Sequence, residues 1–421
     1  MMKLNSTISF GFIFSLTVLS GENHNWNKWR GPDGNGNWNG PKIQKELPGT
    51  GLRRIWQSKI SPGYSGVTVC NRLVYTMDRP VNTASEETER VLCLDMETGK
   101  LRWEFSYSCR YEKMDYGKGP RASVTILDGK AYSLGAMGHA HCLDAVTGRL
   151  IWKRAWLGKG KAKAPIWGFS SSPEPFNDAI LFHVGNETTG NIQAVSRHSG
   201  KTLWTVGDDT MAGYAPPLPV EHLGNTQLVC WGPNKIMGLP IGGGEQYWSI
   251  PYEVKYGVSI AKPIFEEGIL LVSGFWNGTR AIEIQQNRQG KLLWSEEEKL
   301  RGLMSQPLYS NGICYLLDRS YGLTAFELKT GIILWRDNHN LTAKDRNPQA
   351  TLVWTNRKKG EALALNAEGE LVFLHLNENH YEEYWREQVS GKTWAHPAYS
   401  NSKIYVRDDR GLSCWQLPID E

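Results

Sequence analysis

The chain has 421 residues, of which 21% are charged and 40% are hydrophobic, and its formal net charge is only +4. Positive and negative charges are nearly balanced, which leaves little excess positive charge to neutralise phosphates. We therefore expect no nucleic-acid partner. Intrinsic disorder is excluded as well, because aromatic residues are abundant and the net charge is small. The 44 glycines and 18 tryptophans indicate a β-rich chain with many tight turns.

Residues 1–20 have the pattern of a secretory signal peptide. Lys3 precedes an apolar stretch over residues 8–19, and the small residues Ser20 and Gly21 follow it. The stretch is too short to span a bilayer comfortably, so we expect cleavage after Ser20 rather than a membrane anchor. No other segment has 18 continuous apolar residues. The sequence thus predicts a secreted or periplasmic mature chain without a transmembrane segment.

One motif recurs along the rest of the chain. Residues 91–103 (VLCLDMETGKLRW) and 140–152 (AHCLDAVTGRLIW) share a strand, Asp-x-x-Thr-Gly-Lys/Arg, and a second strand that ends in Trp. Weaker and degenerate copies follow. The motif residues are Trp56, Asp95, Thr98, Gly99, Trp103, Asp144, Thr147, Gly148, Trp152, Gly200, Trp204, Trp248, Gly290, Trp294, Gly331, Trp335 and Trp385. The tryptophans lie 41 to 52 residues apart, a spacing typical of β-propeller blades.

The motif has a structural chemistry. Gly takes the positive φ that a tight hairpin turn requires, and Asp and Thr bond the backbone of the turn. We expect each Trp to project from an outer strand and to pack between neighbouring blades, with its N–H on a backbone acceptor. Cys93, Cys142 and Cys414 share one context, which predicts equivalent small, buried strand positions.

The two ends of the chain complement each other. The last repeat supplies three strands, over residues 396–399, 403–408 and 412–417, and residues 52–59 form an orphan strand with its own Trp. Pairing the two closes a ring and removes the exposed edges. The prediction is therefore an all-β, eight-bladed propeller with four-stranded antiparallel blades over residues 52–421.

These repeats resemble the pyrroloquinoline-quinone (PQQ) repeat of quinoprotein dehydrogenases and of BamB-like outer-membrane-assembly propellers. The segment Trp26-Asn27-Lys28-Trp29-Arg30-Gly31-Pro32, within an N-terminal arm over residues 21–51, and the segment 165–173 are similar to segments of secreted bacterial PQQ-like repeat proteins. The resemblance covers residues 26–420. It implies the fold more firmly than the function, because one propeller scaffold serves many roles.

The resemblance to quinoprotein dehydrogenases raises the question of catalysis. Those enzymes use an acidic base and a Ca²⁺ held by carboxylate and amide oxygens, and many carry a disulfide between adjacent cysteines. None of the seven cysteines here are adjacent, and most candidate acids fall where repeat turns are expected. These acids are Asp115, Asp208, Asp209, Asp318, Asp337, Asp408 and Asp409. We expect no catalytic residue and no resident cofactor; PQQ with calcium belongs to the alternative, an oxidoreductase.

Metal binding is not predicted either. His139 and His141 point to one face of a strand, but no third ligand accompanies them.

A ligand site is expected over the central channel, on the loops between blades and at the approaches to the inner strands. Aromatic side chains with a few cations gather there, a mixture that suits a sugar, a peptide strand or a planar quinone. The alternative is that the aromatics only pack at strand entries. The candidate ligand residues are Arg30, Arg110, Tyr111, Tyr116, Lys118, Trp167, Phe169, Tyr214, Tyr256, Trp276, Asp318, Arg319, Trp394 and His396.

The sequence favours a secreted, non-catalytic propeller that binds an envelope protein or extended peptide, or a small-molecule or glycan ligand. Edge-strand addition and docking on the loop face are the available modes. Two alternatives remain open, a PQQ-dependent oxidoreductase and a carbohydrate-binding propeller. The oxidoreductase demands carboxylates and an amide that converge over the channel above a Trp floor, whereas binding needs only a grooved, aromatic loop face.

Overall fold

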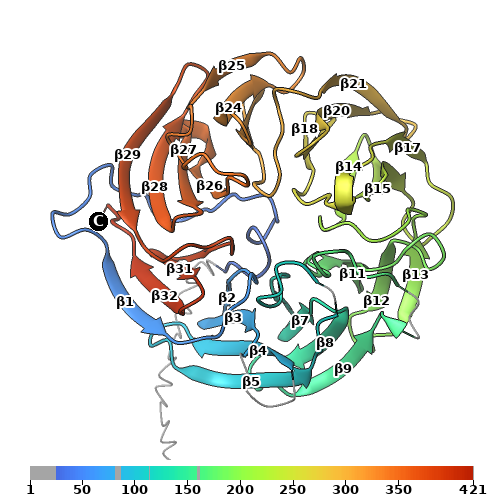
Figure 1. The fold of residues 1–421 in the computed structure, drawn as a ribbon, viewed down its shortest axis with the longest axis horizontal. Coiled ribbons are helices and arrows are strands. Elements are labelled where there is room, and N and C mark those ends of the chain that lie inside the picture. Colours follow the sequence, from blue (N-terminus) through green and yellow to red (C-terminus); the bar gives the residue numbers. More distant parts are fainter. Residues whose placement is uncertain (1–24, 81–86, 113, 159–161, 421) are drawn as a thin grey trace, which may run out of the picture.

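The computed structural model describes residues 25–80, 87–112, 114–158 and 162–420, so the predicted signal peptide lies outside the described residues. Eight four-stranded antiparallel sheets stand around a central axis as the blades of a propeller (Figure 1). The predicted eight-bladed, all-β fold is confirmed.

Within the first seven blades the strands run from the axis outward in chain order. The first blade is β2 (Thr68–Cys70), β3 (Leu73–Asp78), β4 (Thr88–Asp95) and β5 (Leu101–Ser108); the second is β6 (Thr125–Leu127), β7 (Lys130–Leu134), β8 (His139–Asp144) and β9 (Leu150–Ala155). The third is β10 (Glu174–Phe176), β11 (Ala179–His183), β12 (Ile192–Ser196) and β13 (Thr202–Val206); the fourth is β14 (Leu218–His222), β15 (Asn225–Trp231), β16 (Lys235–Leu239) and β17 (Trp248–Pro251).

The fifth blade is β18 (Ile264–Glu266), β19 (Ile269–Gly274), β20 (Gly278–Ile284) and β21 (Gly290–Glu296); the sixth is β22 (Leu308–Ser310), β23 (Ile313–Asp318), β24 (Gly322–Glu327) and β25 (Ile333–Arg336). The seventh is β26 (Ala350–Asn356), β27 (Glu361–Asn366), β28 (Glu370–Leu376) and β29 (Tyr381–Gln388). Two short 3₁₀ turns, η2 (Lys255–Gly257) and η3 (Arg357–Lys359), interrupt the loops. No helix within the described ranges is long and apolar enough to cross a membrane.

The eighth blade joins the two ends of the chain. β30 (Ala398–Ser400), β31 (Lys403–Arg407) and β32 (Leu412–Gln416) come from the C-terminal end, and β1 (Arg53–Ser58) pairs antiparallel with β32 as the outermost strand. The predicted closure by the N-terminal strand is confirmed. It leaves every blade with four strands and holds the ring shut through backbone hydrogen bonds.

Several motif tryptophans join neighbouring blades as expected, whereas Trp248 donates to the Gln227 side chain of its own blade, at 2.9 Å. Trp56 donates from Nε1 to the carbonyl of Met96, at 2.9 Å, and Trp103 donates to Ala145, at 3.0 Å; each acceptor belongs to the turn region of the next blade. The turn glycine Gly99 has φ +68°, and a Cβ at that position would lie 2.5 Å from the Trp56 ring. Only glycine therefore allows both the turn and the close approach of the indole.

Cysteines stand opposite three of the motif tryptophans in the ladders. Cys93 pairs with Trp103, Cys142 with Trp152 and Cys414 with Trp56, and all three cysteines are buried. The predicted equivalence of these cysteines follows from this pairing. The position also accepts a large residue, because Phe373 pairs with Trp385 in the seventh blade.

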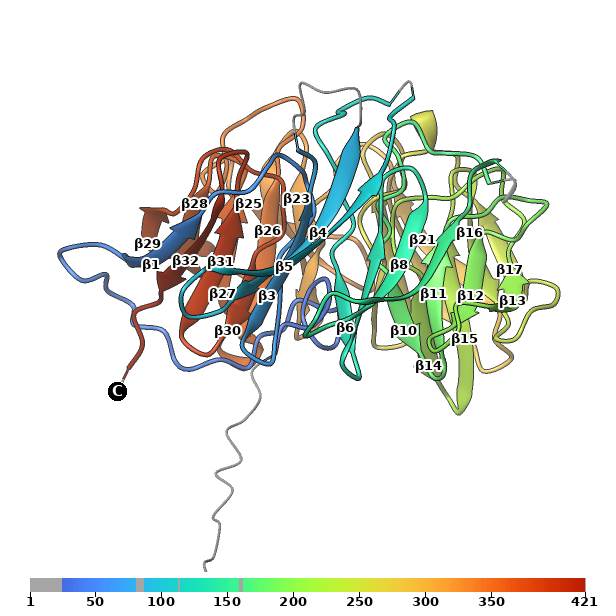
Figure 2. The same cartoon turned by 90° about the horizontal axis from the view of Figure 1, so that it is seen from below.

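The N-terminal arm crosses one face of the ring, the lower face in Figure 2. Trp26 exchanges backbone hydrogen bonds with Val69 of β2, and farther along Asn37 forms a parallel bridge with Trp354 of β26. The fully buried Trp26 and the buried Trp38 both pack against Tyr399, with ring centroids 5.1 and 5.2 Å away. The arm is thus bound to the inner strands of the first and seventh blades, which flank the eighth (Figure 1).

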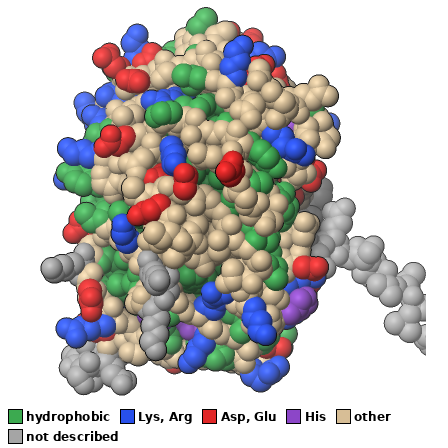
Figure 3. All heavy atoms as spheres, turned by 90° about the vertical axis from the view of Figure 1, so that its right-hand side faces the viewer, with side chains coloured by type: hydrophobic (Ala, Val, Ile, Leu, Met, Phe, Trp, Pro, Cys, Tyr) green, Lys and Arg blue, Asp and Glu red, His purple; other side chains and the backbone are tan. Residues whose placement is uncertain are grey.

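The outer wall is chemically mixed. On the side of β13, β17 and β21, basic, acidic and hydrophobic side chains are interspersed (Figure 3). This pattern agrees with the even charge balance of the chain.

Candidate functional site

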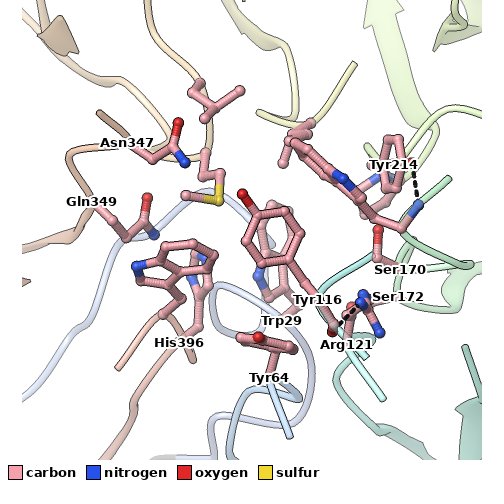
Figure 4. Close-up of a pocket in the computed structure, with 16 residues that line it drawn as sticks. Trp29, Tyr64, Tyr116, Arg121, Ser170, Ser172, Tyr214, Asn347, Gln349 and His396 are labelled. Carbon is pink, nitrogen blue, oxygen red and sulfur yellow. Dashed lines mark hydrogen bonds between the residues drawn. The ribbon is translucent and has the colours of Figure 1, made fainter. Parts of the chain in front are cut away.

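A pocket lies at the centre of the ring, and one repeated position builds its walls. In seven of the eight blades, the residue four positions before the innermost strand lines this central pocket. These residues are Tyr64, Arg121, Ser170, Tyr214, Ile260, Met304 and Trp394. In the seventh blade Asn347 and Gln349 take the place of that residue. The backbone repeats around the axis while the side chains at this position differ, so the pocket is asymmetric (Figure 4).

One wall of the central pocket is aromatic. Tyr64 stacks on Trp394 with ring centroids 5.9 Å apart, and Tyr116 lies against both Trp394, at 5.7 Å, and Trp167, at 5.4 Å. Trp167 continues to Tyr214, whose hydroxyl accepts the Trp167 backbone N–H at 3.0 Å. These rings support one another, which fixes the wall.

The opposite wall is aliphatic and amide-bearing. Ile260, Leu303 and Met304 supply apolar surface. Asn347 and Gln349 lie together on one side of the pocket, and Ser170 and Ser172 lie on the other (Figure 4). The Gln349 side-chain oxygen accepts a hydrogen bond from Ser305 at 3.1 Å, which leaves its amide N–H group for a ligand.

Trp29 of the arm forms the floor of the pocket. Its ring packs against His396, with centroids 5.1 Å apart. Burial, together with the nearby charge of Arg30, lowers the pKa of His396 to about 3, so this imidazole is neutral at physiological pH. The enclosed space is about 140 Å³, close to the size of a cavity that holds one benzene molecule.

Charged side chains near the floor hold the arm in place. The buried Glu174 carboxylate lies 2.6 Å from Lys28 Nζ and 3.5 Å from Lys262 Nζ. Arg30 is 1% exposed and donates to the carbonyls of Leu352, at 3.3 Å, and Asn35, at 3.2 Å. None of these four side chains lines the central pocket, but the charge of Arg30 acts on it by lowering the pKa of His396.

Arg121 is the cation that lines the central pocket, and its guanidinium is already engaged. It donates to the carbonyls of Gly119, at 2.6 Å, and Tyr116, at 2.6 Å, and it lies over the Tyr64 ring. It thereby fixes the loop that carries Tyr116.

A buried carboxylate anchors the other end of this loop. Glu89 is fully buried and accepts hydrogen bonds from the hydroxyls of Tyr107, at 2.5 Å, and Tyr111, and from the backbone N–H of Ala136, at 3.1 Å. Glu89 belongs to β4 and Ala136 to the second blade. The carboxylate therefore ties the loop after β5 to two blades.

Five of the predicted ligand residues meet in the central pocket: Tyr116, Trp167, Tyr214, Trp394 and His396. The other candidates lie elsewhere. Phe169 is fully buried beneath the pocket wall, Tyr111 bonds Glu89, Lys118 pairs with Asp409 at 2.5 Å, and Arg110 is exposed. Arg30 lies in the arm, behind the floor.

The remaining candidates form a second aromatic group near η2. Tyr256, which is 58% exposed, meets Trp276 with centroids 5.9 Å apart, and Arg319 lies over the Phe275 ring at 4.3 Å. Asp318 is buried and accepts backbone N–H groups of Arg301, at 2.6 Å, and Ser320, at 2.7 Å. None of these residues lines the central pocket.

Sequence reasoning missed Trp29, Tyr64, Arg121, Asn347, Gln349 and most of the aliphatic wall. The signal that finds most of them is positional: counting four residues back from each inner strand selects seven lining residues, whatever their chemistry. A search for aromatic or charged candidates alone passes over the members of this set that are neither, namely Ser170, Ile260 and Met304. Trp29 follows from no repeat, because only the path of the arm brings it to the axis.

Several candidate acids hold turns. Asp209 accepts the backbone N–H groups of Thr210, at 2.7 Å, and Asn234, at 2.9 Å, and Asp337 accepts those of Leu323, at 2.7 Å, and Leu341, at 2.8 Å. Asp408 does the same for Arg410, at 2.7 Å.

The histidine pair in β8 packs against an aromatic ring. His139 and His141 lie against the Tyr107 ring, with centroids 5.6 and 4.3 Å away. Elsewhere the structure brings together His375, His380 and Glu382, whose ligand atoms lie within 4.8 Å of one another at the β28–β29 hairpin. Imidazole and carboxylate groups suit zinc. The group is largely exposed on the outer part of a blade, however, and does not line the central pocket.

Comparison with known proteins places the fold in a family. The sequence profile described as outer membrane protein assembly factor BamB matches residues 87–337, more than half of the chain. The chain belongs to this family. The BamB of Moranella endobia (strain PCIT) is 22% identical over 339 residues, which cover 74% of this chain and 82% of that protein. The predicted PQQ-like, BamB-like repeat propeller is thereby confirmed.

Solved structures of the same architecture include both binding and catalytic proteins. BamB from Moraxella catarrhalis matches with a TM-score of 0.59 at 16% identity, covering 87% of this chain and all of that one. The quinohemoprotein alcohol dehydrogenase ADHIIG from Pseudomonas putida HK5 matches with a TM-score of 0.64 at 12% identity, covering 94% of this chain and 81% of that one. At such identities the likeness of the solved structures shows the fold alone. The function of this chain has to be argued from the residues of its own central pocket.

Proposed function

We propose that this chain is a secreted or periplasmic, non-catalytic binding propeller that takes its ligand in the central pocket. The observation that carries the proposal is the lining of that pocket. Six aromatic side chains surround the space, and the described lining includes no carboxylate. The aromatic residues are Trp29, Tyr64, Tyr116, Trp167, Tyr214 and Trp394. Concave, mostly apolar sites with a few polar groups are typical of ligand binding.

The same lining argues against PQQ and calcium. Ca²⁺ takes about six to eight oxygen ligands, with carboxylates prominent among them. Asn347 and Gln349 offer amide oxygens, but no Asp or Glu joins them in the described lining. PQQ carries three carboxylates, and the one lining cation, Arg121, already bonds backbone carbonyls. The residues do not fit the pair, which supports a propeller that works without this cofactor.

The family name, outer membrane protein assembly factor, supports a role in which the propeller holds another envelope component. The second aromatic group, around Tyr256 and Trp276, offers a further contact for an envelope protein or extended peptide. η2 lies on the face that also carries the loops around residues 105–120, opposite the arm (Figure 2). A partner docked on this face would cover the mouth of the central pocket.

The first test is titration of the purified chain with PQQ, with and without Ca²⁺, followed by calorimetry and by dye-linked alcohol oxidation. We expect neither saturable binding nor turnover. One-to-one binding with turnover would establish the oxidoreductase instead.

A positive test uses indole as a probe of the pocket, because a small apolar chamber takes up a neutral aromatic molecule. We expect calorimetry to show saturable indole binding that Trp394→Ala abolishes. Tyr256→Ala, which removes an exposed aromatic outside the pocket, should leave the binding unchanged. Equal loss in both variants, or no binding to the parent chain, would refute the pocket as the ligand site.

A further inference from the structure

We infer that the central pocket binds a single neutral sugar ring, the end unit of a glycan or a free saccharide. This inference rests on the proposed function and adds the chemical class of the ligand. Three properties of the pocket lead to it: the absence of a carboxylate from its described lining, its aromatic wall and the uncharged polar groups on two sides of the space (Figure 4).

The charges of the lining exclude one class of ligand. Arg121 donates three of its guanidinium N–H groups to the carbonyls of Asp115, Tyr116 and Gly119, at 3.0, 2.6 and 2.6 Å, so these donors hold the loop and do not face a ligand. His396 faces the floor as a neutral imidazole, and the described lining contains no carboxylate. An amine would lose its hydration here, find no carboxylate and lie near the guanidinium charge, which is costly. Cationic ligands are therefore excluded.

The aromatic wall sets the shape of the ligand. The rings of Tyr64, Trp394 and Tyr116 adjoin one another, at 5.9 and 5.7 Å, and present a continuous apolar surface. The space of about 140 Å³ is large enough for one six-membered ring. A further unit of the ligand would extend toward the loops at the mouth.

The polar groups separate a sugar from a plain aromatic ring. Asn347 has no hydrogen-bond partner among the described residues, and Gln349 uses only its oxygen, toward Ser305. Ser170 lies across the pocket from both amides (Figure 4). An aromatic side chain of a peptide would desolvate these groups without bonding them. A pyranose has apolar C–H faces for the rings and hydroxyls around its edge for the amides and Ser170.

The decisive experiment compares ligands that differ only in charge. The full chain is titrated by calorimetry with methyl glycosides and with cellobiose, maltose and chitobiose, at millimolar concentrations. Glucuronate and glucosamine serve as matched charged rings. We expect one or more neutral saccharides to bind at least about tenfold more tightly than glucosamine, whose ammonium group meets no carboxylate in the described lining. Glucosamine binding comparable to that of the neutral saccharides, or tighter binding of glucuronate, would overturn the inference.

Variants then locate the sugar. Asn347→Ala should weaken saccharide binding by up to about tenfold, the effect of one hydrogen bond, and leave indole binding unchanged. Trp394→Ala should weaken both, and Tyr256→Ala should weaken neither. If Asn347→Ala leaves saccharide affinity unaltered, the Asn347 amide does not bond the ligand and the inference is wrong.

The outcomes separate this inference from the proposed function. Indole binding without saccharide binding retains the pocket as a ligand site and refutes the sugar. Tight binding of N-acetyltryptophanamide in place of saccharides likewise refutes the sugar and points to a peptide side chain. If neither indole nor any saccharide binds, both proposals fall. Retention of the chain on an insoluble polysaccharide would show that the pocket takes the end unit of a glycan. Binding of saccharides in solution without such retention would indicate a free saccharide.

Discussion

Replacing Trp56 by alanine tests how the ring is held shut. Trp56 is 9% exposed, lies on β1 and bonds the Met96 carbonyl of the first blade at 2.9 Å. Its ring also meets Tyr405 of the eighth blade, with centroids 5.9 Å apart. The residue therefore joins the N-terminal strand, the C-terminal strands and the first blade.

The magnitude follows from burial. A Trp side chain buries about 150–250 Å², which at about 25 cal/mol per Å² gives roughly 4–6 kcal/mol as an upper bound. The lost hydrogen bond adds about 1 kcal/mol, and partial collapse of the site recovers some of the total. We expect Trp56→Ala to lower the free energy of unfolding by about 3–5 kcal/mol.

Urea unfolding followed by circular dichroism measures this loss. Trp204→Ala is the matched control, because Trp204 holds the same motif position but is half-buried and faces the degenerate turn around Gly243, where a Cβ would come no nearer than 3.3 Å to any atom. Its loss should be clearly smaller. If Trp56→Ala unfolds within about 1 kcal/mol of the parent chain, the closing joint is not held by this indole and the reasoning is wrong.

Three further predictions follow from particular contacts. Gly99→Val should lower the melting temperature markedly, because a side chain at φ +68° is strained and its Cβ meets the Trp56 ring; an unchanged melting temperature would refute the turn geometry. Glu89→Ala should cost about 1–3 kcal/mol and speed amide exchange over residues 108–112 and 114–121, because Tyr107 and Tyr111 lose their acceptor; protection equal to the parent chain would show that the loop is held otherwise. His183 accepts the Gly213 N–H, and burial lowers its pKa to about 4, so the unfolded chain binds the proton more readily and stability should fall as pH drops from about 6.5 to about 4. His183→Gln should shrink this loss in pH-dependent urea titrations, and an equal loss would assign it to other groups.

The blades could be predicted from the sequence because their chemistry is local and repeated. Asp95 and Asp144 bond the Thr and backbone N–H groups of their own turns, at 2.9 Å, and the signal recurs in chain order. Ring closure could be predicted as well, because the last repeat lacks one strand and the unpaired N-terminal strand can complete it.

The site was less accessible because its members lie far apart in the chain and no two need the same chemistry. Trp394 and Tyr64 stack although they lie at opposite ends of the sequence, and the aliphatic wall carries no chemical signature. Trp29 reaches the axis only because the arm is bound to β2 and β26, the inner strands of the two blades that flank the eighth. Such convergence depends on the closed ring, which no local pattern encodes.

The repeat itself indicates where specificity is encoded. Turn positions that hold the blades, such as Gly99 and Gly148, are both glycine because each meets the indole of the preceding blade, Trp56 and Trp103 respectively. The position four residues before each inner strand meets no common partner, and it changes from Tyr64 through Ile260 to Trp394 around one axis. The backbone at this position is the same in each blade, whereas the side chains differ and do not hold the blades together. The chemistry of the pocket can therefore vary without changing the fold. Substitutions at that position should therefore alter ligand affinity with little effect on stability, the reverse of substitutions in the motif.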